Sequence, residues 1–153
     1  MPPKSLPKIC LVEDYTADAM LMKIGVRRTS AQVELCVEST GEAALTRLAE
    51  DPADTYRLVV LDINLPRLSG FEILKRLKAD PHTASTPVIM MSSSTNSNDV
   101  DKAYALGAVA YLVKPFEPKD YETVALALAE ACEDVARLET SIGKQHFIPN
   151  RAA

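Results

Sequence analysis

The sequence predicts a single α/β domain built on a parallel sheet with helices on both faces. The length of 153 residues suits one domain, because domains cluster at roughly 100 to 150 residues. Strand-like and helix-like segments alternate along the chain, and this alternation is typical of parallel strands joined by helical crossovers. Several strand-like segments are continuously apolar, which indicates a sheet that is covered on both sides.

The first half of the chain is expected to contain two strands and two helices. Apolar residues recur at helical spacing in the segment after the first strand. Residues 39–42, Ser-Thr-Gly-Glu, fit a capping box, in which a hydroxyl and a carboxylate satisfy the free amides at a helix start. The expected elements are strand 8–12, helix 17–28, strand 33–37 and a helix from the capping box to about residue 50.

The second half is expected to contain three strands and three helices. A second capping box, Ser-Gly-Phe-Glu, stands at 69–72, and Gly107 suits the end of a helix. The expected elements are strand 58–61, a helix from the second capping box, strand 88–91, helix 99–106, strand 109–113 and a last helix near Pro118. The domain is expected to span 8–142, with tails at 1–7 and 143–153.

Polar residues follow the apolar strands directly. They are Glu13 and Asp14, then Asp62 with Asn64, then Ser92, then Lys114. Because ligands of parallel sheets bind outside the carboxyl ends of the strands, these side chains are expected to converge at one edge. Carboxylates brought together repel one another, and Mg²⁺ would neutralise them. An aspartate beside Mg²⁺ can attack an activated phosphoryl group, whose oxygens Lys114 and the Ser92 hydroxyl would stabilise.

In this order, these residues resemble the receiver domains of two-component response regulators. The motifs are Glu13-Asp14, Leu-Asp-Ile-Asn-Leu-Pro at 61–66, Gly70, Pro-Val-Ile-Met-Met-Ser at 87–92 and Tyr-Leu-Val-Lys-Pro-Phe at 111–116. The resemblance covers residues 8 to 138. It implies a flavodoxin-like, doubly wound five-stranded parallel sheet in the order 2-1-3-4-5 with five helices, the last one extended.

The resemblance also implies a role for each site residue. Asp62 is the expected phosphoacceptor. Asp14, Asp62 and the main-chain carbonyl of Asn64 are expected to hold Mg²⁺, or Mn²⁺ in its place, and Glu13 would join them through a metal-bound water. Lys114 would pair with the phosphoryl group.

Three further residues complete the set that the resemblance implies. The Lys114–Pro115 bond is expected to be cis, a form confined largely to bonds that precede proline. Ser92 and Tyr111 are expected to form a switch pair, in which the hydroxyl moves toward the phosphate and the aromatic ring turns inward.

The implied function is that of a single-domain response regulator. A sensor histidine kinase would phosphorylate Asp62 in a Mg²⁺-dependent reaction, and the added charge would switch a protein-interaction surface toward a downstream partner that the sequence does not identify. The segments VEDYTAD, LDINLPRLSG and MMSSSTNSNDV look most like regulators paired with bacterial phytochromes.

Two other functions compete with this expectation. An aspartate-based phosphohydrolase would carry a second aspartate two residues after Asp62, where this chain has Asn64, so a separate enzymatic activity is not expected. A phosphorylation-independent binding scaffold would need no complete acid and lysine set, and that set is intact here. A phosphate-sink partner would use the same set, so this alternative stays open.

Composition excludes several other classes. The net charge of −4 gives no reason to expect nucleic-acid binding, which usually shows a basic patch. No apolar run approaches the roughly 20 residues that cross a bilayer. The opening MPPKSLP is followed by no apolar region of signal length, so a cytoplasmic location is expected.

The last helix carries an apolar stripe that is longer than a sheet of this size would cover. Its spacings alternate between three and four, as in a heptad seam. The stripe comprises Tyr121, Val124, Leu128, Ala131, Val135, Leu138 and Ile142. We expect Val135, Leu138 and Ile142 to lack partners within the chain, and this predicts a homodimer through the helix and the tail residues 147–148.

Overall fold

The chain folds around one twisted sheet whose strands are mostly parallel. The computed structural model describes residues 5–152, so the start of the predicted N-terminal tail (1–4) and residue 153 lie outside the description. The strand order is β2-β1-β3-β4-β5-β6. The strands are β1 (Lys8–Val12), β2 (Glu34–Glu38), β3 (Tyr56–Leu61), β4 (Val88–Ser92), β5 (Ala110–Val113) and β6 (Phe147–Ile148). The predicted order 2-1-3-4-5 is therefore confirmed, with one strand added.

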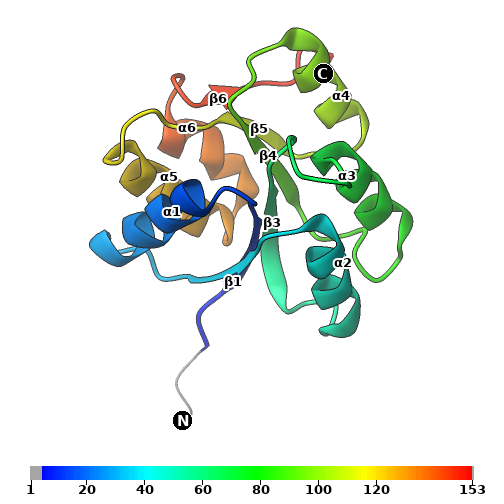
Figure 1. Ribbon diagram of the computed structural model, residues 1–153. Coiled ribbons are helices and arrows are strands. Elements are labelled where there is room, and N and C mark those ends of the chain that lie inside the picture. Colours follow the sequence, from blue (N-terminus) through cyan, green and yellow to red (C-terminus); the bar gives the residue numbers. More distant parts are fainter. Residues whose placement is uncertain (1–4, 153) are drawn as a thin grey trace.

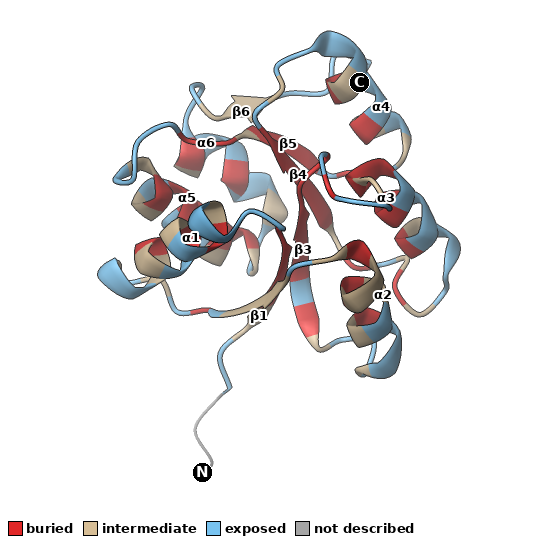
Figure 2. Cartoon of the chain, in the orientation of Figure 1, coloured by how far each residue is buried: buried red, intermediate tan, exposed pale blue. Residues whose placement is uncertain are grey.

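Helices cover both faces of the sheet (Figure 1). They are α1 (Thr16–Arg28), α2 (Gly41–Glu50), α3 (Gly70–Ala79), α4 (Ser97–Ala105), α5 (Asp120–Ala131) and α6 (Leu138–Ile142), with a short 3₁₀ turn at Val135–Arg137. The side chains of α2, α3 and α4 pack on one face, and those of α1, α5 and α6 pack on the other. Figure 2 shows that the central strands β1, β3, β4 and β5 are mostly buried, as their apolar sequences predict, whereas the edge strands β2 and β6 are only partly buried.

Alternation along the strands divides the core into two parts. Cys10 and Val12 of β1 point toward α2 and α3, whereas Ile9 and Leu11 point toward α1 and α5. Both faces need apolar residues, so the strand reads as one continuous apolar run. The cap predicted at Ser69 forms, since its hydroxyl accepts a hydrogen bond from Glu72 N (3.3 Å). The first cap falls one residue later than predicted: the Thr40 hydroxyl accepts from Ala43 N (3.1 Å), and Glu42 Oε2 finds no hydrogen-bond partner within residues 5–152.

The last helix is not extended, which corrects the sequence prediction. α5 ends at Ala131, and the chain turns before the 3₁₀ segment. The carboxylate of Asp134 accepts a hydrogen bond from Ala136 N (3.0 Å), so Asp134 caps a new helical turn instead of continuing the old one. This break lets α6 fold back onto the same layer as α5.

The expectation that Val135, Leu138 and Ile142 lack partners within the chain is wrong for the same reason, so these residues no longer give a reason to expect a homodimer through this seam. Leu138 and Ile142 are 1% and 4% exposed and lie in the core beside α5, and Val135 is partly buried against that core. The apolar stripe therefore has partners within its own chain. A straight helix would have left these side chains in solvent, which is why the periodicity alone suggested a second copy.

Replacing Leu138 with alanine is expected to lower the free energy of unfolding by about 2 to 4 kcal/mol, since it opens a cavity in a packed core. Urea denaturation measures this change. The matched control is Leu126→Ala on α5, because Leu126 is 39% exposed and should cost less than about 1 kcal/mol. Equal, small effects at the two positions would show that α6 does not pack as described.

The segment predicted as a C-terminal tail supplies the sixth strand. Phe147 and Ile148 pair antiparallel with Leu112 and Tyr111 of β5. The Tyr104 hydroxyl donates to the Ile148 carbonyl (2.5 Å) and accepts from Tyr111 N (3.1 Å), which ties the segment to α4. The edge of β5 is therefore covered. Within residues 5–152, no helix has the length and apolar character that crossing a membrane requires.

Candidate phosphoacceptor and metal site

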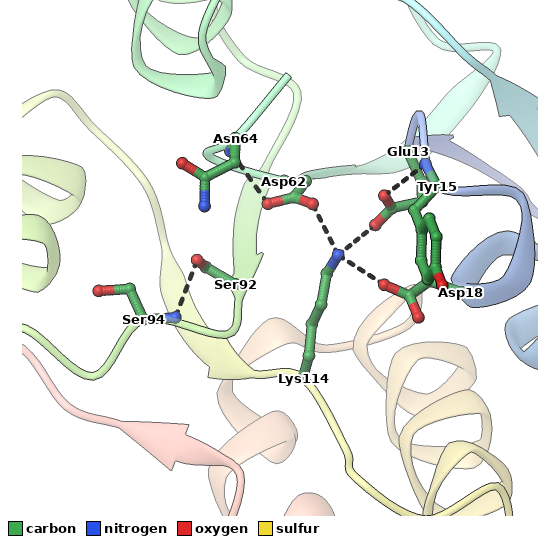
Figure 3. A network of polar contacts seen from close by, with 8 residues as sticks. All are labelled: Glu13, Tyr15, Asp18, Asp62, Asn64, Ser92, Ser94 and Lys114. Carbon is green, nitrogen blue, oxygen red and sulfur yellow. Dashed lines mark hydrogen bonds and ion pairs between the residues drawn. The ribbon is translucent and has the colours of Figure 1, made fainter. Parts of the chain in front are cut away.

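The strand-end residues singled out in the sequence meet at one edge of the sheet (Figure 3). Backbone hydrogen bonds fix where each strand ends. Asp62 N donates to Val12 O (3.3 Å), and Lys114 N donates to Ser92 O (2.9 Å), so the parallel pairing continues up to the site residues. The side chains that follow β1, β3 and β5 are thereby brought to the same place.

A tight loop after β3 holds Asp62 in position. Gly70 N donates to Ile63 O (2.9 Å), which closes the loop onto the start of α3. A Cβ atom at position 70 would overlap the main-chain carbonyl of Asp62, so the close approach requires glycine. On the other side of the loop, Asn64 N donates to Asp62 Oδ1 (3.1 Å) and orients the carboxylate.

Three carboxylates form a cluster that could hold a metal ion. Glu13, Asp14 and Asp62 each offer one oxygen, and the three oxygens lie within 4.8 Å of one another. Glu13 and Asp62 are buried, whereas Asp14 is exposed. Burial raises the pKa of Glu13, although a hydrogen bond from Lys114 acts in the opposite direction. An all-oxygen set with one open side fits a hard divalent cation such as Mg²⁺.

Lys114 is the cation of the site. Its Nζ lies 2.6 Å from Asp62 Oδ2, 2.6 Å from Glu13 Oε2 and 2.9 Å from Asp18 Oδ2. An ammonium group has three N–H donors, so each carboxylate can receive one. Burial lowers the pKa of Lys114, but the three carboxylates outweigh this and raise that pKa above its ordinary value. The lysine therefore stays charged at the centre of the acids.

Asp18 is a member of this network that the sequence analysis missed. It stands in the first turn of α1, four residues after Asp14. An acid in the first turn of a helix is favoured by the helix dipole, so its presence needed no further explanation. The available signal was its closeness in sequence to Asp14, because α1 begins two residues after Asp14.

The proposed switch residues are connected to one another through Ser94. The Ser92 hydroxyl accepts a hydrogen bond from Ser94 N (3.1 Å), and the Tyr111 hydroxyl donates to Ser94 O (2.9 Å). The ring of Tyr111 is fully buried, and burial raises its pKa. Ser94 also donates to Asp99 of α4 (2.7 Å). A displacement at Ser92 can therefore reach both α4 and β5.

The peptide bond between Lys114 and Pro115 is trans, which corrects the expected cis bond. Trans is the more stable form before proline by about 0.5 to 1 kcal/mol, so a cis bond needs contacts that favour it. Phe116, the residue after Pro115, is 94% exposed. Lys114 reaches the carboxylates from the trans chain.

A parallel α/β sheet with acids and a lysine at its carboxyl edge is the arrangement that the sequence motifs led us to expect of a receiver domain. The family model described as response regulator receiver domain matches residues 9–125, and the chain belongs to this family.

Among curated relatives, the chain is 33% identical over 123 residues to response regulator Rcp1 of Synechocystis, covering 78% of this chain and 82% of that protein. It is 35% identical over 107 residues to a probable cyclic di-GMP phosphodiesterase of Vibrio cholerae. The match covers 70% of this chain but spans only 23% of that protein's length.

Two solved structures extend the similarity to the fold. The phosphorylated cyanobacterial phytochrome response regulator RcpA matches with a TM-score of 0.76 and 28% identity, over 85% of this chain and 96% of the other. The Mn²⁺-bound form of Rcp1 matches with a TM-score of 0.70 and 30% identity, over 80% and 91% of the two chains.

Proposed function

We propose that this domain accepts a phosphoryl group on Asp62 from a sensor histidine kinase, in a reaction that requires Mg²⁺ or Mn²⁺. The observation that carries the proposal is the position of Asp62, a buried carboxylate 2.6 Å from Lys114 and within 4.8 Å of two other acids. A carboxylate kept for solubility alone would have no reason to lie among them. The Mn²⁺-bound relative supports a divalent cation at these acids.

The chemistry is a phosphoryl transfer between two nucleophiles. A carboxylate oxygen of Asp62 forms a bond to phosphorus, and the bond from phosphorus to the donor histidine nitrogen breaks. The electron pair of that bond stays on the imidazole, and the product is an acyl phosphate. Glu13, Asp14 and Asp62, with the Asn64 carbonyl, would hold the divalent cation, which neutralises charge on the acids and the phosphoryl oxygens.

The chain's own residues provide the remaining stabilisation. Lys114 already contacts Asp62 and would pair with a phosphoryl oxygen once that oxygen is attached. The Ser92 hydroxyl accepts from Ser94 N, so its own hydrogen can be directed toward the phosphoryl group. A movement of Ser92 toward the phosphoryl group would change the contacts of Ser94 with Tyr111 and with α4, and this would shift the equilibrium between two arrangements of α4 and β5.

The likeness to phytochrome response regulators supports a narrower proposal about the donor. We infer that the kinase is a bacteriophytochrome-type histidine kinase, since RcpA is a phytochrome response regulator and 85% of this chain matches it. The downstream partner would bind beside α4 and β6, since β6 covers the edge of β5.

The proposal is tested by incubating the protein with Mg²⁺ and a small phosphodonor and measuring bound phosphate that is stable to acid and labile to base. Removal of Mg²⁺ with a chelator is expected to prevent its formation. Transfer from a labelled phytochrome-type kinase, compared with other histidine kinases at equal concentration, tests the donor. Phosphate incorporation that is unaffected by the chelator would contradict the metal requirement.

A further inference from the structure

One partner of Lys114 lies outside the group of acids that could hold a metal. Glu13 and Asp62 belong to that group, but Asp18 does not. Asp18 nevertheless contacts Lys114 directly, with 2.9 Å between Oδ2 and Nζ. Its side chain is 23% exposed and reaches from α1 across to the end of β5 (Figure 3). A favourable position near the helix N-terminus explains an acid in this turn, but not its contact with the lysine.

Lys114 and a divalent cation would both draw on the carboxylates of Glu13 and Asp62. The lysine occupies Asp62 Oδ2 and Glu13 Oε2, both at 2.6 Å. The second oxygen of Glu13 is also in use, because Oε1 accepts from Tyr15 N (3.0 Å). A cation that enters among these acids must therefore draw carboxylates away from Lys114. The cost in free energy of separating these carboxylates from Lys114 is smaller if the ammonium group keeps another carboxylate that the cation does not use.

We propose that Asp18 is a positioning residue that holds Lys114 and so lowers its competition with the divalent cation. When the acids turn to the cation, Asp18 remains as the partner of the ammonium group and keeps it beside Asp62, where a phosphoryl oxygen would need it. The inference rests on the proposed function and deepens it, because it assigns a role in metal entry to a residue that is not a metal ligand.

The test measures Mg²⁺ affinity of the unphosphorylated protein by calorimetry, with Asp18→Asn against the parent chain. Asn keeps an acceptor but loses the charge, so Lys114 should hold Glu13 and Asp62 more firmly. Mg²⁺ binding is then expected to weaken about three- to tenfold, in proportion to one charge-assisted hydrogen bond at a partly exposed position. The matched control is Glu117→Gln: Glu117 lies three residues after Lys114, is exposed and pairs with Lys119 (3.8 Å). Glu117→Gln should change the Mg²⁺ affinity less than about twofold.

A double-mutant cycle decides how Asp18 acts. In a Lys114→Met background, the effect of Asp18→Asn should shrink to that of the Glu117→Gln control. If Lys114→Met does not fold, Lys114→Gln replaces it. An undiminished effect without the lysine would mean that Asp18 acts on the cation itself, and this overturns the proposal. The proposal is also overturned if, in the parent chain, Asp18→Asn changes the Mg²⁺ affinity no more than Glu117→Gln does.

The same measurements separate this inference from the proposed function. A parent chain that binds no Mg²⁺ would overturn both. If the expected affinity pattern appears but the protein forms no acid-stable phosphate, the phosphoacceptor function fails while the role of Asp18 toward Lys114 stands.

Discussion

Replacing Asp62 with asparagine is expected to abolish phosphorylation by both a small phosphodonor and a histidine kinase. The amide nitrogen cannot carry the acyl phosphate, and the remaining carbonyl oxygen is a poor nucleophile. Incorporation of acid-stable, base-labile phosphate should fall by about a thousandfold or more, which corresponds to losing the nucleophile of the reaction. The measurement is labelled phosphate bound to the protein after incubation with Mg²⁺ and donor.

The fold should survive this change, so the loss can be assigned to chemistry. Asp62 is one of several buried or half-buried acids around one lysine, and removal of one negative charge relieves repulsion among them. Asp101→Asn, on the exposed side of α4, changes the net charge equally and should leave phosphorylation intact. Phosphate retained at the parent level in Asp62→Asn would place the phosphoacceptor elsewhere and remove the basis of the proposed function.

The arrangement of the core and the meeting of the acids could both be predicted from the sequence. The strands that run continuously apolar, such as 58–61, are those in the middle of the sheet. Such runs alternate with helical segments along the chain, and this combination is typical of a parallel sheet covered by helices on both faces. Once the strands are parallel, the residues that follow them share an edge. The convergence of Glu13, Asp62 and Lys114 at one edge follows from the parallel direction of the strands, whereas the strand order was implied only by the resemblance to receiver domains.

The features that escaped prediction depend on tertiary contacts. Nothing in the local pattern near Asp134 separates a helix that continues from one that stops and restarts, because the apolar spacing is the same in both cases. The strand at 147–148 is too short to be recognised, and its pairing depends on the free edge of β5. The contact of Asp18 with Lys114 was not predicted, because an aspartate is already favoured in the first turn of a helix and therefore gave no sign of a second role.

Replacing Lys114 with methionine is expected to slow both formation and loss of the phosphoryl group on Asp62. Lys114 is the one side chain with a positive charge that contacts the nucleophile within residues 5–152. In either direction of transfer, charge on the phosphoryl oxygens would lose this partner, and removal of one such group costs about ten- to a hundredfold in rate. Time courses of phosphate incorporation, and of its decay after donor removal, measure the two rates.

The same change should lower stability in a way that depends on pH. Lys114→Met leaves Glu13 and Asp62 buried without their cation, and breaking a buried ion pair costs about 3 to 5 kcal/mol. Burial already raises the pKa of Glu13, and loss of the lysine hydrogen bond raises it further. An acid whose pKa is higher in the folded than in the unfolded state binds its proton more tightly when folded, so stability falls as pH rises through this range.

Lys114→Met is therefore expected to lower the free energy of unfolding less at pH 5 than at pH 7, because Glu13 takes up a proton at the lower pH. Urea denaturation of the variant and the parent chain at both pH values measures this stability deficit. Added Mg²⁺ should reduce the deficit at pH 7 by replacing the missing positive charge. Lys119→Ala is the control. Lys119 is 77% exposed, and its replacement removes one positive charge without changing a contact of the site. A deficit that is equal at both pH values, and indifferent to Mg²⁺, would mean that Lys114 contributes packing and does not neutralise the buried acids.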